Sequence, residues 1–124
     1  MTINNNGDNG RAIETRGKIT SFTLEGCTIN ITGKGNNQGI TIGGSQTSKA
    51  EINIKGSTIS VGNAGYPIIA YNPMTLSMNN SKLTGYSAIY FKGVVSSEGS
   101  HNSVVNIANC EYICPNVYDK GSND

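Results

Sequence analysis

One ten-residue pattern occurs four times in this chain and constrains its fold more than any other feature. In its clearest copy, Ile52 and Ile54 alternate with polar residues, the pair Gly56 and Ser57 follows, and Ile59 begins a second alternation. Period-2 alternation on both sides of such a pair predicts two short β-strands joined at a sharp corner. The copies align without a gap when their corners are superposed: FTLEGCTINI, INIKGSTISV, LSMNNSKLTG and VNIANCEYIC.

The corner residues of the four copies are Gly26, Gly56, Asn80 and Asn109. Gly and Asn are the residues that accept a positive φ at the lowest cost. We therefore expect a left-handed backbone at all four positions, which turns the chain without interrupting a strand ladder. The corners are 30, 24 and 29 residues apart, and a period of about 20 to 50 residues is typical of stacked repeats.

A third short strand is predicted after each pair, at 39–42, 68–70, 88–91 and 116–118. Three strands per period, each stacked on its counterparts, predict an all-β fold. The specific prediction is a right-handed parallel β-helix, or solenoid, of about four to five coils with three short strands per coil. We expect residues 1–124 to form a single domain or a fragment of one. Residues 1–10 are interpreted as an N-terminal cap or a frayed tail, with Ile3 and Ile13 as alternative strand residues of a first turn, and 119–124 as a polar tail.

Composition agrees with strands and argues against several functions. The chain has fifteen Ile and six Val but only three Leu, and β-branched residues suit strands better than helices. A net charge of +1 with 14% charged residues predicts no nucleic-acid partner and no attraction to anionic membranes. No apolar run is long enough to insert into a membrane, and the first residues do not form a signal peptide.

The alternation also predicts which side chains face the interior. Two inward columns are expected to run through the four copies: Leu24, Ile54, Met78 and Ile107 before the corner, and Ile29, Ile59, Leu83 and Tyr112 after it. The position directly after the corner holds Cys27, Ser57, Ser81 and Cys110, which we interpret as a site for a small, nearly apolar side chain. The cysteines are expected to be structural thiols, although a Cys110–Cys114 disulfide stays an alternative that would distort a strand.

The motifs FTLEGCTI, INIKGSTI, LSMNNSKL and VNIANCEY, with the returning strands GITI and AIYF, resemble those of the pectate-lyase-like right-handed parallel β-helix superfamily. The resemblance covers roughly residues 12–118 and is closest to the β-helical stretches of bacterial surface and adhesin proteins. It implies a solenoid fold. Proteins of this fold include polysaccharide lyases, glycoside hydrolases, phage tailspikes and adhesins, so the resemblance leaves both enzymatic and non-enzymatic functions open.

The charged residues argue against catalysis. Lyases of this fold need clustered carboxylates for Ca²⁺, and hydrolases need a group of aspartates, but no two of the eight acidic residues occupy the same outward position in adjacent coils. The charges that do align are opposite in sign, Glu25 with Lys55 and Lys82 with Glu111, which indicates ion pairing on a solvated face. We expect no catalytic residue, no cofactor and no metal site, and we interpret His101 as a solvated loop residue.

Aromatic residues suggest a binding surface instead. Tyrosines gather around the third strand of each period, and exposed aromatic rings are surfaces on which sugars stack. The candidate glycan contacts are Tyr66, Tyr71, Tyr86 and Tyr90. The alternative is that about half of these rings cover the core.

The sequence therefore predicts a non-catalytic structural or recognition module of a larger bacterial or phage surface protein, with glycans as a candidate ligand. The alternative is a polysaccharide lyase or glycoside hydrolase, or a fragment of one. The expected location is the cell surface, the secreted fraction or a phage particle. Because solenoids need capped ends, we also expect further coils of the parent chain, or another subunit, to cover the C-terminal coil.

Overall fold

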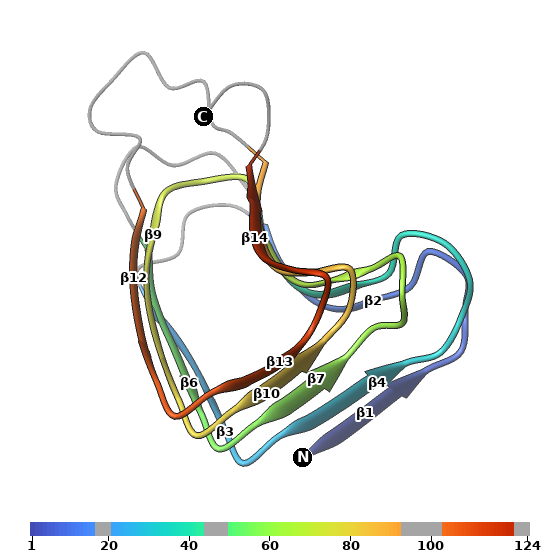
Figure 1. The fold of residues 1–124 in the computed structure, drawn as a ribbon, viewed down its shortest axis with the longest axis horizontal. Coiled ribbons are helices and arrows are strands. Elements are labelled where there is room, and N and C mark those ends of the chain that lie inside the picture. The colour runs from blue at the N-terminus through green and yellow to red at the C-terminus, as the bar shows by residue number, and fades with distance from the viewer. Residues whose placement is uncertain (17–20, 44–49, 93–102, 121–124) are drawn as a thin grey trace.

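The computed structural model describes residues 1–16, 21–43, 50–92 and 103–120, and in these ranges every regular element is a β-strand (Figure 1). The strands form three parallel sheets. Sheet A contains β1 (Thr2–Asn5), β4 (Thr28–Ile31), β7 (Thr58–Ser60), β10 (Lys82–Thr84) and β13 (Glu111–Ile113). Sheet B contains β2 (Arg11–Thr15), β5 (Gln38–Ile42), β8 (Tyr66–Ala70), β11 (Ser87–Phe91) and β14 (Asn116–Lys120). Sheet C contains β3 (Ser21–Glu25), β6 (Ala50–Lys55), β9 (Met74–Asn79) and β12 (Val104–Ala108).

The chain visits sheets A, B and C in turn and then starts the next coil, so each sheet is one wall of a parallel β-solenoid. In Figure 1 the successive copies of each strand follow the same course, closely overlaid in sheet C and fanned apart in sheet A. The predicted all-β solenoid with three strands per coil is confirmed.

The N-terminal segment begins with β1, which pairs in register with β4. The last strand continues to Lys120, two residues beyond its predicted end at Tyr118, into the segment expected to be a polar tail. Residues 121–124 of that tail lie outside the described ranges.

The corners between sheets C and A have the backbone conformation that the aligned repeat predicts. The φ angles are 60° at Gly26, 53° at Gly56, 48° at Asn80 and 54° at Asn109. The corner N–H of each coil also reaches the following coil. Gly26 donates to the carbonyl of Lys55, and the two next corners repeat this bond. The left-handed turn therefore changes the strand direction while the hydrogen bonds between coils continue.

Replacing Gly56 with Val should lower the free energy of unfolding by about 1 to 2 kcal/mol, because a β-branched side chain is strained at positive φ. A Cβ on Gly56 would meet no heavy atom within 4 Å beyond its chain neighbours, so the cost comes from the backbone. Gly56→Asn is the matched control and should cost much less, since Asn80 and Asn109 hold the same place. Equal urea-denaturation midpoints for the two variants would contradict this explanation.

The serine side chains directly after the corners make hydrogen bonds to the backbone. This corrects the interpretation of the column as a site for a nearly apolar side chain. The Ser57 hydroxyl accepts a hydrogen bond from the Cys27 N–H at 3.1 Å and donates one to the Lys55 carbonyl at 2.9 Å. Ser81 repeats this role, accepting from the Ser57 N–H at 3.1 Å. The hydroxyls therefore satisfy buried backbone groups of adjacent coils, which would otherwise cost about 1 to 3 kcal/mol each. All three cysteines are free thiols.

The two predicted inward columns line the core, except at the C-terminal coil. Leu24, Ile54 and Met78 are 3%, 0% and 2% exposed, and the second column is equally buried as far as Leu83. Ile107 keeps the predicted register with Met78, yet it is 39% exposed, so its prediction as a core residue is wrong. Tyr112 is only partly buried. Both residues belong to the last strand of their sheet, where the described structure has no following strand to cover them.

The two predicted charge alignments are present as strand neighbours on the outer surface. Glu25 lies opposite Lys55 in the register of β3 and β6. Lys82 lies opposite Glu111, and its Nζ atom is 3.7 Å from a carboxylate oxygen of that residue. Both side chains of the second pair are largely exposed, so the pair contributes at most about 1 kcal/mol to stability.

Candidate functional site

Sheet B bends sharply, and this bend determines which side chains gather on the outside of the solenoid. A Cβ on Gly39 would stand 2.6 Å from the buried Ile59 side chain, so Gly39 faces the interior. The next residue, Ile40, is also fully buried. Two consecutive inward residues break the strict alternation and turn the strand, as the ribbons near the β14 label show (Figure 1). The residues on either side of this pair, Gln38 and Thr41, consequently both face outwards and approach each other.

The same geometry recurs in successive coils and creates a surface that we call the outer bend. One of its columns runs through the residues before the inward pair, Arg11, Gln38 and Tyr66. The other runs through the residues after it, Glu14, Thr41, Ile69 and Tyr90. Across the bend the side chains interact within one coil: the Thr41 hydroxyl donates to the Gln38 side-chain oxygen at 2.8 Å.

At the C-terminal part of the outer bend, three tyrosines form one cluster. The rings of Tyr66 and Tyr90 stack with centroids 4.6 Å apart at 27°, and the Tyr86 ring meets Tyr66 edge-on at 6.2 Å and 86°. The Lys92 Nζ atom lies 5.7 Å from the centroid of the Tyr90 ring, within the range of a cation–π contact. Tyr86 is 42% exposed, so the cluster presents an aromatic ring to solvent.

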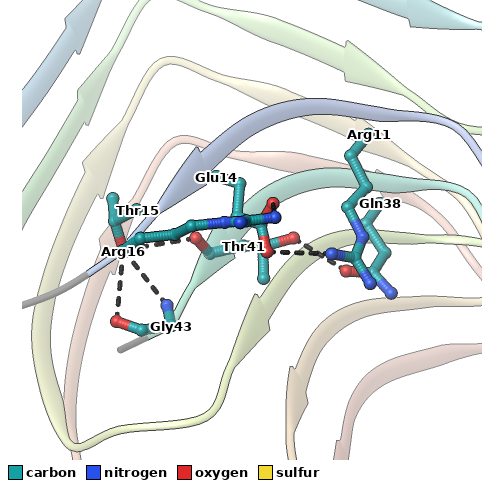
Figure 2. Close-up of polar contacts among 7 residues, drawn as sticks. All are labelled: Arg11, Glu14, Thr15, Arg16, Gln38, Thr41 and Gly43. Atoms are coloured by element: carbon teal, nitrogen blue, oxygen red, sulfur yellow. Dashed lines mark hydrogen bonds and ion pairs between the residues drawn. The ribbon is translucent and has the colours of Figure 1, made fainter. Parts of the chain in front are cut away.

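At the N-terminal part of the outer bend, one carboxylate is held between two guanidinium groups. Glu14 accepts a hydrogen bond from Arg11 at 2.8 Å and another from Arg16 at 3.1 Å. Figure 2 shows the two arginines reaching Glu14 from opposite sides. The Thr15 hydroxyl accepts from the Gly43 N–H at 3.1 Å and so ties the ends of β2 and β5 together. The outer bend therefore changes from ionic, through amide and hydroxyl, to aromatic along the solenoid axis.

Three of the four candidate glycan contacts come together, and one does not. Tyr66, Tyr86 and Tyr90 form the cluster, whereas Tyr71 follows the end of β8, is partly buried and lies outside it. The sequence interpretation missed Gln38, Thr41 and Lys92 as neighbours, because it assigned inward and outward faces only to the two strands that flank each corner and not to the third strand. A signal for the bend was present: the position of Gly39 is occupied by small or compact residues in β2, β8 and β11, namely Ala12, Pro67 and Ala88, although β14 has Val117 there.

Apart from the outer bend, a hollow of about 470 Å³ opens beside β13. It is lined by Asn63, Gly85, Tyr112, Ile113, Cys114 and Pro115. Burial, and after it the neighbouring Cys110 and Cys114 thiols, raises the pKa of the Tyr112 phenol to about 12. Burial also raises the pKa of the Cys114 thiol. Both groups therefore keep their protons at neutral pH, and neither is activated as a nucleophile or a base.

Within the described residues, no group of three or more His, Cys, Asp or Glu side chains is placed to hold a metal ion. His101, the lone histidine, lies outside the described ranges. In the same part of the chain, no helix has the length and apolar character needed to cross a bilayer.

Comparison of the chain with protein-family models, with curated proteins and with solved structures finds no match.

Proposed function

We propose that this chain is a non-catalytic recognition module of a larger bacterial or phage surface protein, and that its outer bend contacts glycans. The observation that carries the proposal is the clustering of Tyr66, Tyr86 and Tyr90 on one wall, with Tyr86 exposed. Sugar rings pack their C–H faces on aromatic rings, and their hydroxyls need amide, hydroxyl and charged partners nearby. The Arg11–Glu14 pair and Lys92 lie along the same surface and supply charged groups, whereas Gln38 and Thr41, at 9% and 2% exposed, bond each other and support the wall from beneath.

The proposal includes a family and a location. The repeat motifs support membership of the pectate-lyase-like parallel β-helix superfamily, on its adhesin-like side, and a place at the cell surface, in the secreted fraction or on a phage particle. A solenoid suits this role because its ladders hold side chains of successive coils about 4.8 Å apart. A ligand that repeats along its length can then contact a rigid row of side chains. Because these side chains are already held in place, binding costs the protein little conformational entropy.

Tyr86→Ala should weaken glycan binding by about 3- to 10-fold, which corresponds to the roughly 0.5 to 1.5 kcal/mol of one aromatic contact. The glycan ligand would be identified on an array of neutral and acidic bacterial and plant polysaccharides. Its affinity for the protein would then be measured by calorimetry. Tyr86→Phe is the matched control and should retain most of the affinity, because it keeps the ring. Lys82→Ala, on the outside of sheet A, should change nothing.

Two results would overturn the proposal. One is that no polysaccharide on the array binds the protein, or that a polysaccharide binds the wild type and Tyr86→Ala with the same affinity. The other is release of reducing or unsaturated sugar ends from a polysaccharide, with loss of that activity on replacing Glu14, Glu51 or Glu111. That second result would favour the alternative, a polysaccharide lyase or glycoside hydrolase.

A further inference from the structure

The three walls of the solenoid do not end at the same coil. Sheets A and B each contain five described strands, whereas sheet C contains four. Because the chain visits A, B and C in order, β13 and β14 belong to a fifth coil whose sheet C strand is not among the described elements. The place for that strand is on the free edge of β12, beside the ends of β13 and β14.

The strand β12 is exposed to a degree that no other strand of its sheet approaches. All five of its residues are exposed, including Val104 at 42%, Val105 at 37% and Ile107 at 39%. The opposite edge of the same sheet, β3, is different: Leu24, in the same column as Ile107, is only 3% exposed. Apolar side chains and a backbone edge that pairs with no further described strand thus coincide at β12, a combination that templates the addition of a strand.

We propose that the edge of β12 accepts one extended peptide segment that runs parallel to it and carries the pattern of this chain's own repeat. Opposite Val105 and Ile107 the segment needs apolar residues, as in the pairs Phe22 and Leu24 or Ile52 and Ile54 of earlier coils. Between them it needs a polar residue, since Thr, Asn, Ser and Asn fill the outward column from β3 to β12.

The hydrogen bonds of the first three corners specify which residues the segment needs after its apolar pair. The corner N–H groups of Gly26, Gly56 and Asn80 each donate to the carbonyl that precedes the next corner. Asn109 holds the fourth place in this series, so its N–H is directed at the corresponding carbonyl of an added segment. The N–H groups of Cys27 and Ser57 each find a serine hydroxyl in the next coil. By the same relation, the added segment needs Gly or Asn at its corner and Ser directly after it.

A complete second copy of the chain does not fit this place. If a second copy stacked its β1 on β13, the rise of the solenoid would leave its β3 two strand spacings, about 9.6 Å, from β12. If its β3 instead paired with β12, its β1 would occupy the space of β13. The edge of β12 therefore suits one extended peptide strand with its corner, and not the complete first coil of a second copy.

The test uses the full chain and a fluorescein-labelled peptide of sequence AEINIKGSTIS, which is that of residues 50–60. Fluorescence anisotropy should show saturable binding, and Ile107→Lys should weaken it at least 10-fold. Thr23→Lys, on the opposite edge of sheet C, is the matched control and should bind the peptide like the wild type. Circular dichroism and melting of each variant establish that both remain folded.

Backbone methylation of the peptide tests the strand geometry itself. In a parallel ladder, alternate residues direct their N–H groups to opposite sides. Methylating one alternate set of amides should abolish binding, and methylating the other set should leave it. Absence of saturable binding, equal effects of the two methylated peptides, or unchanged binding to Ile107→Lys would each overturn the proposal. Light scattering that shows self-association abolished by Ile107→Lys would also overturn it, in favour of a second copy. Because Tyr86→Ala should leave peptide binding intact, this proposal and the glycan proposal fail independently.

Discussion

Replacing Asn37 with Ala should lower the free energy of unfolding by about 3 kcal/mol or more, the largest effect expected for a single polar side chain here. Asn37 is 1% exposed. Its side-chain oxygen accepts from the Gly10 N–H at 2.9 Å, and its amide nitrogen donates to the carbonyls of Gly33 at 2.7 Å and Val61 at 3.0 Å. One side chain therefore satisfies backbone groups of three successive coils. Its removal takes this partner from the buried Gly10 N–H and Val61 carbonyl and from the partly buried Gly33 carbonyl.

Two further variants make this test specific. Asn36→Ala is the matched control, because Asn36 is exposed and its N–H bond to Asn9 does not involve its side chain; it should change stability by less than about 0.5 kcal/mol. Asn37→Asp keeps the acceptor for Gly10 but turns a carboxylate oxygen towards two carbonyls. Protonation of the substituted carboxyl restores one donor, and the two carbonyls keep its folded-state pKa above the unfolded value of about 4. Asn37→Asp should therefore recover part of its stability as the pH falls towards about 4. Similar urea midpoints for Asn36→Ala and Asn37→Ala would contradict the assigned role.

Replacing Ile54 with Ala should cost about 2 to 5 kcal/mol, as large-to-small changes in a packed core do. Ile54 is fully buried and stacks between Leu24 and Met78 in the inward column of sheet C. Neither neighbour can close the cavity easily, because the strand ladder holds both backbones at fixed separations. Ser60→Ala, on the outer side of β7, is the control and should alter the melting temperature little. Comparable losses in the two variants would mean that the inward and outward faces are assigned wrongly.

The outer bend and the β12 edge are separate surfaces with different chemistry. The outer bend presents an exposed tyrosine in an aromatic cluster, with charged side chains on the same wall. The β12 edge presents Val105 and Ile107 beside a backbone edge on which no other described strand pairs. A polar ligand with C–H faces suits the first surface, and a peptide strand suits the second. The two proposals therefore place glycan contact on one wall of the solenoid and peptide contact at one end of it.

Sequence alone determined the repeat, the corners and most of the core. Glycine and asparagine at Gly26, Gly56, Asn80 and Asn109 specify a left-handed backbone through local sterics, and period-2 alternation specifies which side chains face inwards. Both are properties of a few consecutive residues, so they can be predicted without coordinates. The parallel solenoid follows, because strands with this pattern at this period bury their apolar sides only by stacking.

Tertiary structure alone decided the outer bend, the role of Asn37 and the exposure of β12. Two consecutive inward residues, Gly39 and Ile40, shift the alternation of sheet B, so tyrosines from different coils meet outside it. Asn37 occurs in a polar loop sequence, and its three partners come from residues 10, 33 and 61. Ile107 fits the core pattern yet is 39% exposed, whereas Leu24 at the opposite edge of sheet C is 3% exposed, because burial depends on what the rest of the chain places around each edge. Each of these features depends on which coil lies next to which, and a local pattern does not contain that information.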